Sequence, residues 1–180
     1  TDRALAFLLG QRGRPFFLVW SHYYVHDPVR TRARWLLEKY RSKLPAGADE
    51  VRAAYGAMVE TLDHEVGRLL REVEALGLWE DTLVLFTSDN GGHSGYTANG
   101  PLRGGKWNLY EGGIRVPLLV RWPGRVPAGR VCAEPVTGCD LFATFREVAG
   151  GKEDGVVRDG RSLRPLWQGA PRLPGERPLV

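Results

Sequence analysis

The stretch Leu83–Gly113, LVLFTSDNGGHSGYTANGPLRGGKWNLYEGG, contains the pattern that decides the fold. It begins with the apolar run Leu83–Phe86, whose length and residue types are typical of a buried strand. The run ends at the small, turn-forming residues of Thr87–Gly92, and a glycine-rich loop follows. A second apolar run, Val116–Val120, predicts a further strand. Because open α/β sheets bind ligands at the carboxyl ends of their strands, we expect a site in the loop after the first run.

The flanking segments predict an α/β architecture. Phe16–Trp20 has the composition of a buried strand, and Asp49–Leu76 carries apolar residues at the three- and four-residue spacing of an amphipathic helix. Strand, helix and strand in this order form a βαβ unit with parallel strands. The sequence therefore predicts a mixed, mostly parallel sheet flanked by helices, in a domain over residues 1–150. Residues 151–180 are rich in Gly, Pro and Arg, and we expect an ordered-to-loose tail, either a trailing segment of the same domain or the start of a C-terminal region.

Four shorter elements complete this prediction. Helices are expected over Thr1–Leu9 and Arg30–Lys43, and another is expected to start with Asp140 as its cap and to end at Gly150. Val131–Val136 has the composition of a short strand.

The bulk composition excludes several classes of protein. The 180 residues are enough for one domain with a sizeable core, and no apolar run approaches the ~18 residues that a membrane span needs. The net charge is +4, but the basic residues are scattered and not gathered in blocks, so no nucleic-acid partner is expected. Cys132 and Cys139 could pair, yet two cysteines form neither a disulfide framework nor a zinc motif. Composition indicates no particular compartment or oligomeric state.

Four side chains could carry chemistry. Asp89 and Asn90 offer a carboxylate and an amide oxygen, which Ca²⁺ or Mg²⁺ prefers, although the same pair before a glycine could form a simple turn. Lys106 follows two glycines that let the backbone approach a ligand, so its ammonium could hold a sulfate or phosphate oxygen or remain a solvated surface group. His26 lies just past a predicted strand end, where either a functional histidine or an ordinary loop histidine can occur.

The runs TSDNGG and NGPLRGGKWNLYEGGIRVPLLVRWPG closely resemble the sulfatase family, within the alkaline-phosphatase-like superfamily. The resemblance includes PFFLVWSHYYVHDP upstream and AEPVTGCDLFATFREVAG and DGRSLRPLW downstream, and it covers Arg14–Gln168. It implies an alkaline-phosphatase-like fold and hydrolysis of a sulfate ester, by a formylglycine nucleophile together with one divalent ion. That ion is usually Ca²⁺, with Mg²⁺ as the alternative. The organic part of the substrate is not identified by these motifs.

The resemblance also implies roles for individual residues. Asp89 and Asn90 match two ligands of the metal ion. Lys106 matches the lysine that contacts the substrate sulfate, and His26 matches the second histidine of a His-x-x-x-His-x-Pro segment, which contacts the sulfate ester. His93 follows the acid-amide pair and is expected to line the substrate pocket. Supporting or structural roles are expected for five further residues: His22, Asp63, His64, Arg103 and Glu111.

Neither cysteine fits the nucleophile. Formylglycine is made from the first residue of Cys/Ser-x-Pro-x-Arg, but the proline after Cys132 comes one place too late and Cys139 has none. The resemblance puts the nucleophile and the remaining metal carboxylates upstream of Thr1, so these residues alone are expected to have no sulfatase turnover. The alternatives are a phosphodiesterase or phosphonate monoester hydrolase of the same superfamily, and a non-catalytic chain that binds metal and anions.

Overall fold

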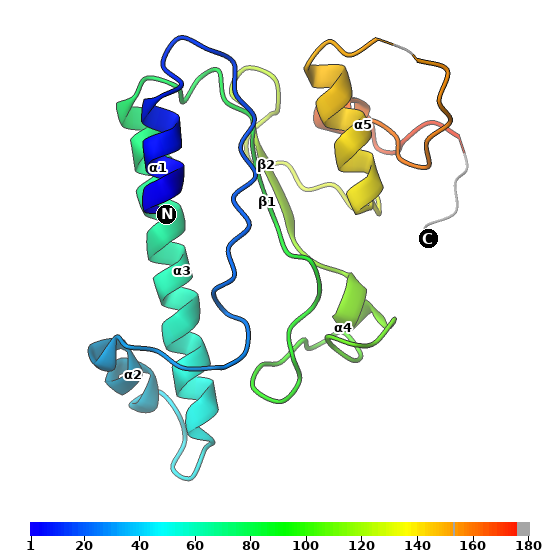
Figure 1. Ribbon diagram of the computed structural model, residues 1–180. Helices are drawn as coiled ribbons and strands as arrows, with labels where there is room; N and C mark the ends of the chain where they lie inside the picture. Colours follow the sequence, from blue (N-terminus) through cyan, green and yellow to red (C-terminus); the bar gives the residue numbers. More distant parts are fainter. Residues whose placement is uncertain (153, 176–180) are drawn as a thin grey trace. The chain divides into compact units, whose positions relative to one another are not determined.

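The computed structural model describes residues 1–152 and 154–175 (Figure 1). Two compact units are formed, one by residues 1–79 with 85–119 and the other by residues 80–84 with 120–180. The described elements are, in chain order, α1 (Asp2–Leu9), α2 (Arg34–Arg41), α3 (Glu50–Ala75), β1 (Val84–Thr87), α4 (Glu111–Ile114), β2 (Leu118–Arg121), α5 (Gly138–Val148) and α6 (Arg164–Trp167).

The long helix α3 organises the first unit. Asp49 caps it, because the Asp49 side chain accepts a hydrogen bond of 3.0 Å from Val51 N. Helices α1 and α2 both pack on α3, and Gly56 makes the α2 contact possible, since a Cβ at this position would lie 2.6 Å from the Tyr40 ring. The predicted helix over Asp49–Leu76 is therefore confirmed. The predicted helix over Thr1–Leu9 is also confirmed, as α1. Helix α2 is shorter than the predicted helix over Arg30–Lys43. The buried side chains of α3 are Ala53, Ala57, Met58 and Val73.

Strands β1 and β2 pair in a two-stranded sheet (Figure 1). Thr87 Oγ1, at the end of β1, donates a hydrogen bond of 2.9 Å to Pro117 O, directly before β2. Further along, Gly91 N donates to Gly113 O at 2.9 Å. The chain therefore turns back on itself between the strands, which makes the pair antiparallel. Helices and strands both occur, as the α/β class requires, but the mostly parallel sheet stays a prediction.

Two predicted strands do not form. The segment Phe16–Trp20 is extended but has no assigned secondary structure (Figure 1). Its side chains alternate between half-buried and exposed, and Phe17 and Val19 are 65% and 71% exposed. A buried strand of a parallel sheet needs cover on both faces, which the described residues do not provide for this segment. Val131–Val136 is likewise irregular, because its first side chain is almost fully exposed and has no apolar surface to cover it.

A buried carboxylate holds the second unit together. Asp140 is fully buried, and its two side-chain oxygens accept hydrogen bonds from Thr137 N at 2.7 Å and from Arg161 N at 2.8 Å. Thr144, which is also buried, donates to Asp140 O at 2.6 Å and accepts from Leu163 N at 2.8 Å. Two of these four bonds, donated by Arg161 N and Leu163 N, attach the segment before α6 to α5, and the other two lie within α5 and its cap. Thr137, three residues before the predicted cap, is the N-cap of α5, and Asp140 takes part in capping because its side chain accepts from Thr137 N in a capping box.

The described part of the segment after Gly150 contributes to the core of the second unit. Four apolar residues in it are buried, namely Leu163, Leu166, Trp167 and Leu173. The expected ordered-to-loose tail is therefore ordered where these side chains pack. Residues 176–180 lie outside the described residues, and the predicted domain division at residue 150 stays a prediction. Cys132 and Cys139 are exposed and free, so the pairing considered for them does not occur.

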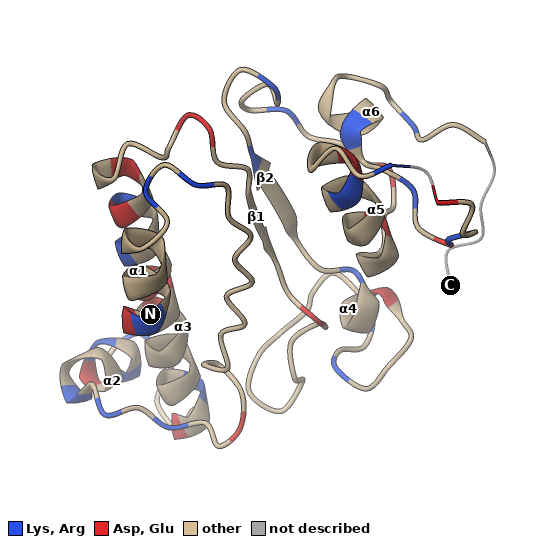
Figure 2. Cartoon of the chain, turned by 45° about the horizontal axis from the view of Figure 1, so that its top comes forward, with Lys and Arg blue, Asp and Glu red and all other residues tan. Residues whose placement is uncertain are grey.

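Basic and acidic residues are interspersed on α1, α2 and α3 (Figure 2). This arrangement agrees with the scattered charge of the sequence. A search of the described residues finds no helix with both the length and the hydropathy for crossing a bilayer.

Replacing Asp140 should destabilise the second unit. Asp140→Ala leaves two buried backbone N–H groups without an acceptor, so we expect the free energy of unfolding to fall by about 3 kcal/mol in urea denaturation. Asp159→Ala is the matched control, because Asp159 is exposed in the same unit, and a change within about 0.5 kcal/mol is expected there. Equal effects of the two substitutions would show that the buried carboxylate does not hold this unit together.

Candidate active site

Hydrogen bonds hold the segment after β1, Asp89–Gly92, against the segment that contains Lys106. Lys106 N donates to Gly92 O at 3.1 Å. The Asn99 side chain forms a two-point clamp on the same glycine: Asn99 Nδ2 donates to Gly92 O and Asn99 Oδ1 accepts from Gly92 N, each at 2.8 Å. The predicted metal pair and the predicted sulfate-binding lysine are thus carried by neighbouring backbone segments.

Glycines make this packing possible. A Cβ at Gly91 would lie 1.8 Å from Gly112 O, and a Cβ at Gly105 would lie 2.5 Å from Gly92 O. Both distances are shorter than any real Cβ contact, so no other residue fits at either position without moving the backbone. Each of the segments TSDNGG, LRGGK and YEGG therefore contains at least one glycine that close backbone contact requires, namely Gly91, Gly105, Gly112 and Gly113.

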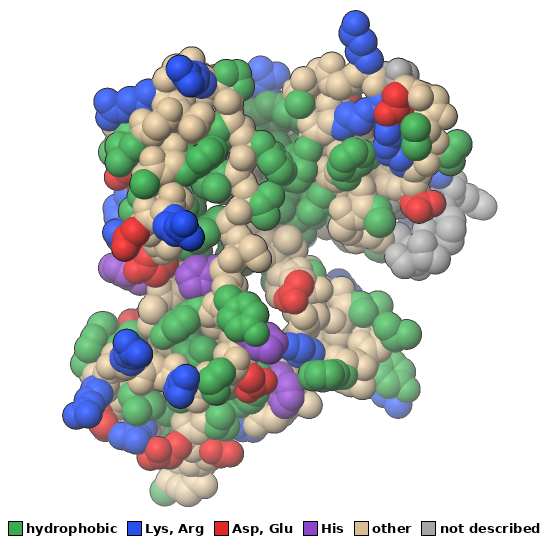
Figure 3. All heavy atoms as spheres, in the orientation of Figure 1, with side chains coloured by type: hydrophobic (Ala, Val, Ile, Leu, Met, Phe, Trp, Pro, Cys, Tyr) green, Lys and Arg blue, Asp and Glu red, His purple; other side chains and the backbone are tan. Residues whose placement is uncertain are grey.

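Lys106 and His26 are in direct contact. Lys106 Nζ lies 2.7 Å from His26 Nε2, although the residues are 80 positions apart in the sequence. An ammonium can only donate, so Nε2 is the acceptor and the ring proton lies on Nδ1, which faces Asp27 O at 3.3 Å. Both members of the pair are solvent-accessible. Figure 3 shows histidine side chains beside basic and hydrophobic ones on this face of the molecule.

Strained backbone flanks both members of this pair. Val25 and Trp107 have φ of 73° and 80°, and among the described residues they are the non-glycine residues in the left-handed region. Val25 directly precedes His26, and Trp107 directly follows Lys106. Each such conformation costs ~1–3 kcal/mol and is typical of functional sites, where the surrounding structure enforces it. The backbone is therefore strained at the positions that present the lysine and the histidine.

An aromatic cluster connects the third predicted residue, His93, to the loop of His26. The His93 ring stacks on Tyr96 with centroids 4.6 Å apart and planes at 6°, and Tyr96 packs against Tyr55 of α3 at 5.1 Å. Tyr96 OH donates to Asp27 Oδ2 at 3.3 Å. Burial, followed by the nearby Asp27 carboxylate, raises the pKa of Tyr96, so its hydroxyl stays protonated as this bond requires. Within the described residues, no hydrogen bond or ring contact joins His93 directly to Lys106 or His26.

The predicted metal ligands are available for coordination. Asp89 is exposed and Asn90 is half-buried, and within residues 1–152 and 154–175 neither side chain has a hydrogen bond or an ion pair. Carboxylate and amide oxygens without protein partners suit a hard cation. The described part of the chain contains no group of three or more His, Cys, Asp and Glu side chains that could hold a metal. Because Ca²⁺ takes about 6–8 oxygen ligands, these two residues can supply only part of a coordination shell.

The residues predicted to support the loop differ in what they contact. The Arg103 guanidinium lies 3.9 Å from the centroid of the Tyr110 ring, and Arg103 O accepts from Gly112 N at 2.8 Å, so Arg103 stabilises the loop. Glu111 forms an exposed ion pair of 2.9 Å with Arg115 on α4 and has no contact that would make it a general base.

The remaining predicted histidines lie in different environments. His22 Nδ1 accepts from Tyr24 N at 3.1 Å, and burial lowers the pKa of His22, so the ring is neutral and structural. Asp63 and His64 are exposed on α3, so the described residues show no packing role for either of them. The stripe that α3 buries lies on another face of this helix.

Four residues that the structure associates with the site were given no role by the sequence. They are Val25, Tyr96, Asn99 and Trp107. The one sequence signal for them is their position among the glycines and next to the candidate residues, which does not reveal a positive φ or a side-chain clamp.

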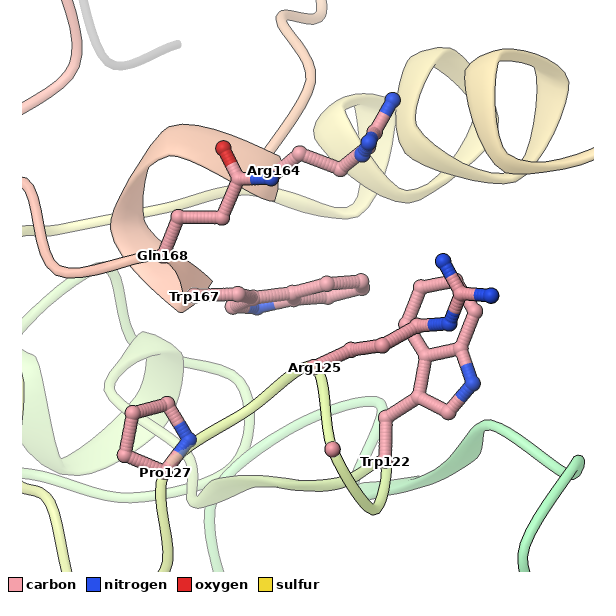
Figure 4. Close-up of a pocket in the computed structure, with 7 residues that line it drawn as sticks. Trp122, Arg125, Pro127, Arg164, Trp167 and Gln168 are labelled. Atoms are coloured by element: carbon pink, nitrogen blue, oxygen red, sulfur yellow. The ribbon is translucent and has the colours of Figure 1, made fainter.

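A separate pocket lies in the second unit (Figure 4). Its volume is about 360 Å³, and Arg125 stacks on Trp122 at its edge with the guanidinium 4.8 Å from the ring centroid. Arg164, in the same lining, is paired with Glu147 at 2.7 Å. The lining contains neither a histidine nor a carboxylate, so this pocket lacks the groups for acid–base or metal chemistry.

A sequence model of the family described as Sulfatase matches residues 1–151 of the chain. The chain belongs to the sulfatase family. This membership agrees with the resemblance of the DNGG and GGK segments.

Known sulfatases and a related hydrolase are similar to most of the chain. It is 41% identical over 178 residues to the steryl-sulfatase of Mus musculus. The matched region covers 93% of this chain and 27% of that enzyme. The crystal structure of Ps i-CgsB in complex with k-i-k-neocarrahexaose matches with a TM-score of 0.80 and 33% identity, over 91% of this chain and 36% of that one. Phosphonate monoester hydrolase of Agrobacterium radiobacter matches with a TM-score of 0.53 and 32% identity, over 67% and 23% of the two chains.

These similarities support an alkaline-phosphatase-like fold. The chain spans 27% and 29% of the length of its first two curated relatives, both steryl-sulfatases.

A methyl group at Gly91 should disrupt the site. Gly91→Ala would put Cβ against the backbone at Gly112, so we expect the loop to rearrange and the free energy of unfolding to fall by about 2 kcal/mol. Urea denaturation and NMR contacts between the His26 ring and the Lys106 side chain measure the two effects.

Gly138→Ala is the control, because nothing lies within 4 Å of a Cβ at Gly138, in the first turn of α5. A stability change within about 0.5 kcal/mol is expected there. A Gly91→Ala protein that retained both its stability and the contact between Lys106 and His26 would contradict the close-contact argument.

Proposed function

We propose that the chain is part of a sulfuric ester hydrolase in which Lys106 and His26 together hold the sulfate group of the substrate. The observation that carries this proposal is the 2.7 Å contact between Lys106 Nζ and His26 Nε2. It brings a cation and an imidazole together at an exposed position beside the DNGG segment. Membership of the sulfatase family and 41% identity to a steryl-sulfatase support the choice of a sulfate ester as the substrate class.

Lys106 is suited to binding the sulfuryl oxygens. An ammonium has three donors, and one of them is directed at His26, so two remain for an anion. Negative charge develops on these oxygens and on the leaving oxygen during hydrolysis, and a fixed cation stabilises it. Hydrogen bonding of Lys106 N to Gly92 O holds the backbone at this lysine in place.

His26 is suited to handling a proton. In the structure its Nε2 accepts from Lys106, whereas an anion inserted between the two side chains would need Nε2 to donate. Binding of the sulfate group therefore requires a proton on Nε2, which the ring gains from solvent or by moving its own proton from Nδ1. The protonated Nε2 can then donate to the leaving oxygen as the ester bond breaks, which is general acid catalysis. His93, stacked on Tyr96, is proposed to line the pocket for the organic part of the substrate.

Asp89 and Asn90 are proposed to supply oxygen ligands to one divalent ion, Ca²⁺ or alternatively Mg²⁺. When bound, such an ion adds positive charge beside the sulfuryl oxygens. The side-chain oxygens of this pair suit that ion, since they follow a strand end and are not engaged by the described protein groups. The formylglycine nucleophile and the other ligands implied by the family resemblance are not among these 180 residues.

A second candidate function is hydrolysis of phosphonate monoesters. The similarity to the phosphonate monoester hydrolase of Agrobacterium radiobacter favours it as the alternative. A lysine and a histidine would bind phosphonate oxygens as readily as sulfate oxygens, so the two functions are separated only by comparing substrates.

Removing the Lys106 ammonium should reduce the activity of the complete gene product. We expect Lys106→Ala to lower kcat/KM for 4-nitrophenyl sulfate by about 100-fold or more, because one charge-stabilising donor is lost. Lys152→Ala is the control, since Lys152 is an exposed lysine of the other unit, and unchanged kinetics are expected. An unchanged kcat/KM in Lys106→Ala would exclude the proposed sulfate contact. A wild-type preference for a phenylphosphonate monoester over the sulfate would favour the second candidate.

Removing the Asp89 carboxylate should weaken metal binding. Isothermal titration of the complete gene product with Ca²⁺ is expected to give a Kd at least about 100-fold higher for Asp89→Ala, since groups that only support ligands already cost about 10–100-fold. The matched control is Asp81→Ala, an exposed aspartate just before β1, for which the same affinity as wild type is expected. If both variants bound Ca²⁺ equally well, Asp89 would not be a ligand.

A further inference from the structure

We propose that Trp107, with Tyr23, forms a ring-binding surface that selects esters whose sulfate is attached to a flat-faced ring, either an aryl group or a pyranose. This inference rests on the proposed function, because it assigns the organic part of the same substrate. Nothing in the sequence motifs pointed to either residue.

Both rings lie next to the sulfate-binding pair. The Tyr23 ring centroid is 5.0 Å from the His26 ring, with an angle of 33° between the planes. Lys106 Nζ is 5.6 Å from the centroid of the Trp107 ring. Each ring thus contacts one of the two side chains proposed to hold the sulfate. A ring attached to that sulfate would have to pass close to these aromatic faces.

Trp107 stands where a turn favours glycine. Asn108 N donates to Gly105 O at 3.0 Å, which closes a four-residue turn with Lys106 and Trp107 at its centre. A positive φ at the third residue, here 80° at Trp107, is the type II pattern, and glycine or asparagine usually occupies that position. A bulky aromatic residue at this position therefore works against folding of the turn.

Packing among the described residues does not compensate for this conformation. The Trp107 side chain is 81% exposed and Tyr23 is 77% exposed, so neither ring fills the core. Large exposed aromatic rings beside a candidate anion site are suited to stacking on a substrate ring, whether an aryl face or the C–H face of a sugar. The strain and the exposure of Trp107 thus both point to a role in binding.

Trp107 could instead act only through Lys106, because 5.6 Å is within the range of a cation–π contact. The two roles differ in what they affect. A ring that orients Lys106 would alter binding of every sulfate, including the inorganic anion. A ring that stacks on the substrate would alter binding of ring sulfates only.

The experiment compares Trp107→Ala with wild type in the complete gene product, on three esters: 4-nitrophenyl sulfate, galactose 4-sulfate and ethyl sulfate. We expect kcat/KM for the preferred ring sulfate to fall about tenfold or more, the effect of one lost stacking contact. For ethyl sulfate the loss should not exceed about twofold, and the inhibition constant of inorganic sulfate should not change. Trp107→Phe, which keeps a ring, should restore most of the loss.

The variants also separate this role from a structural one. Trp107→Gly relieves the strained φ, so its melting temperature is expected to equal or exceed that of wild type. A loss confined to 4-nitrophenyl sulfate supports an aryl substrate, and a loss confined to galactose 4-sulfate supports a pyranose. Equal losses on all three esters, a parallel rise in the inhibition constant of sulfate, or a lower melting temperature of Trp107→Gly would overturn the inference.

Failure of the proposed function gives a different result. A gene product that hydrolyses no sulfate ester contradicts the function, and the ring surface is then tested by binding alone. The indole N–H signal of Trp107 in NMR spectra should shift on addition of phenyl sulfate but not of ethyl sulfate. The absence of a selective shift would overturn the ring surface.

Discussion

The candidate site depends on backbone segments that pack too closely to admit a side chain. A Cβ at Gly112 or Gly113 would lie 2.3 Å from Gly104 O or 2.0 Å from Asn108 O, and the contacts of Gly91 are as short. This contact brings the residues after β1 beside the turn of Lys106. The chemistry of the site therefore begins with residues that have no functional groups of their own.

On this close-packed base, the chain presents its polar groups from strained or clamped positions. Val25 and Trp107 hold positive φ next to His26 and Lys106, while the Asn99 amide holds Gly92 from both sides. Fixed geometry of this kind lowers the cost of ordering side chains when an anion binds. Packing on α3 supplies stability to the unit that carries this strain, through the contact of Tyr96 with Tyr55.

The sequence predicts local elements better than it predicts their pairing. The amphipathic stripe of α3 and the apolar run of β1 each specify their own conformation, so the helix and the strand are confirmed, although β1 is half-buried to exposed and not buried as predicted. The Phe16–Trp20 segment has the composition of a strand but lacks the cover that a buried strand requires. For the site, motifs singled out Lys106 and His26, and the structure puts them in contact. The position of the Trp107 ring, with its centroid 5.6 Å from Lys106 Nζ, depends on a turn geometry, which no motif encodes.

The central claim is that Lys106 and His26 hold one sulfate group together. The most direct test is to follow the ¹⁵N signals of the His26 imidazole in the complete gene product during titration with inorganic sulfate. We expect a saturable change in which His26 Nε2 gains a proton, and loss of that change in Lys106→Ala. Signals of His26 that do not respond to sulfate, or that respond equally without the lysine, would contradict it.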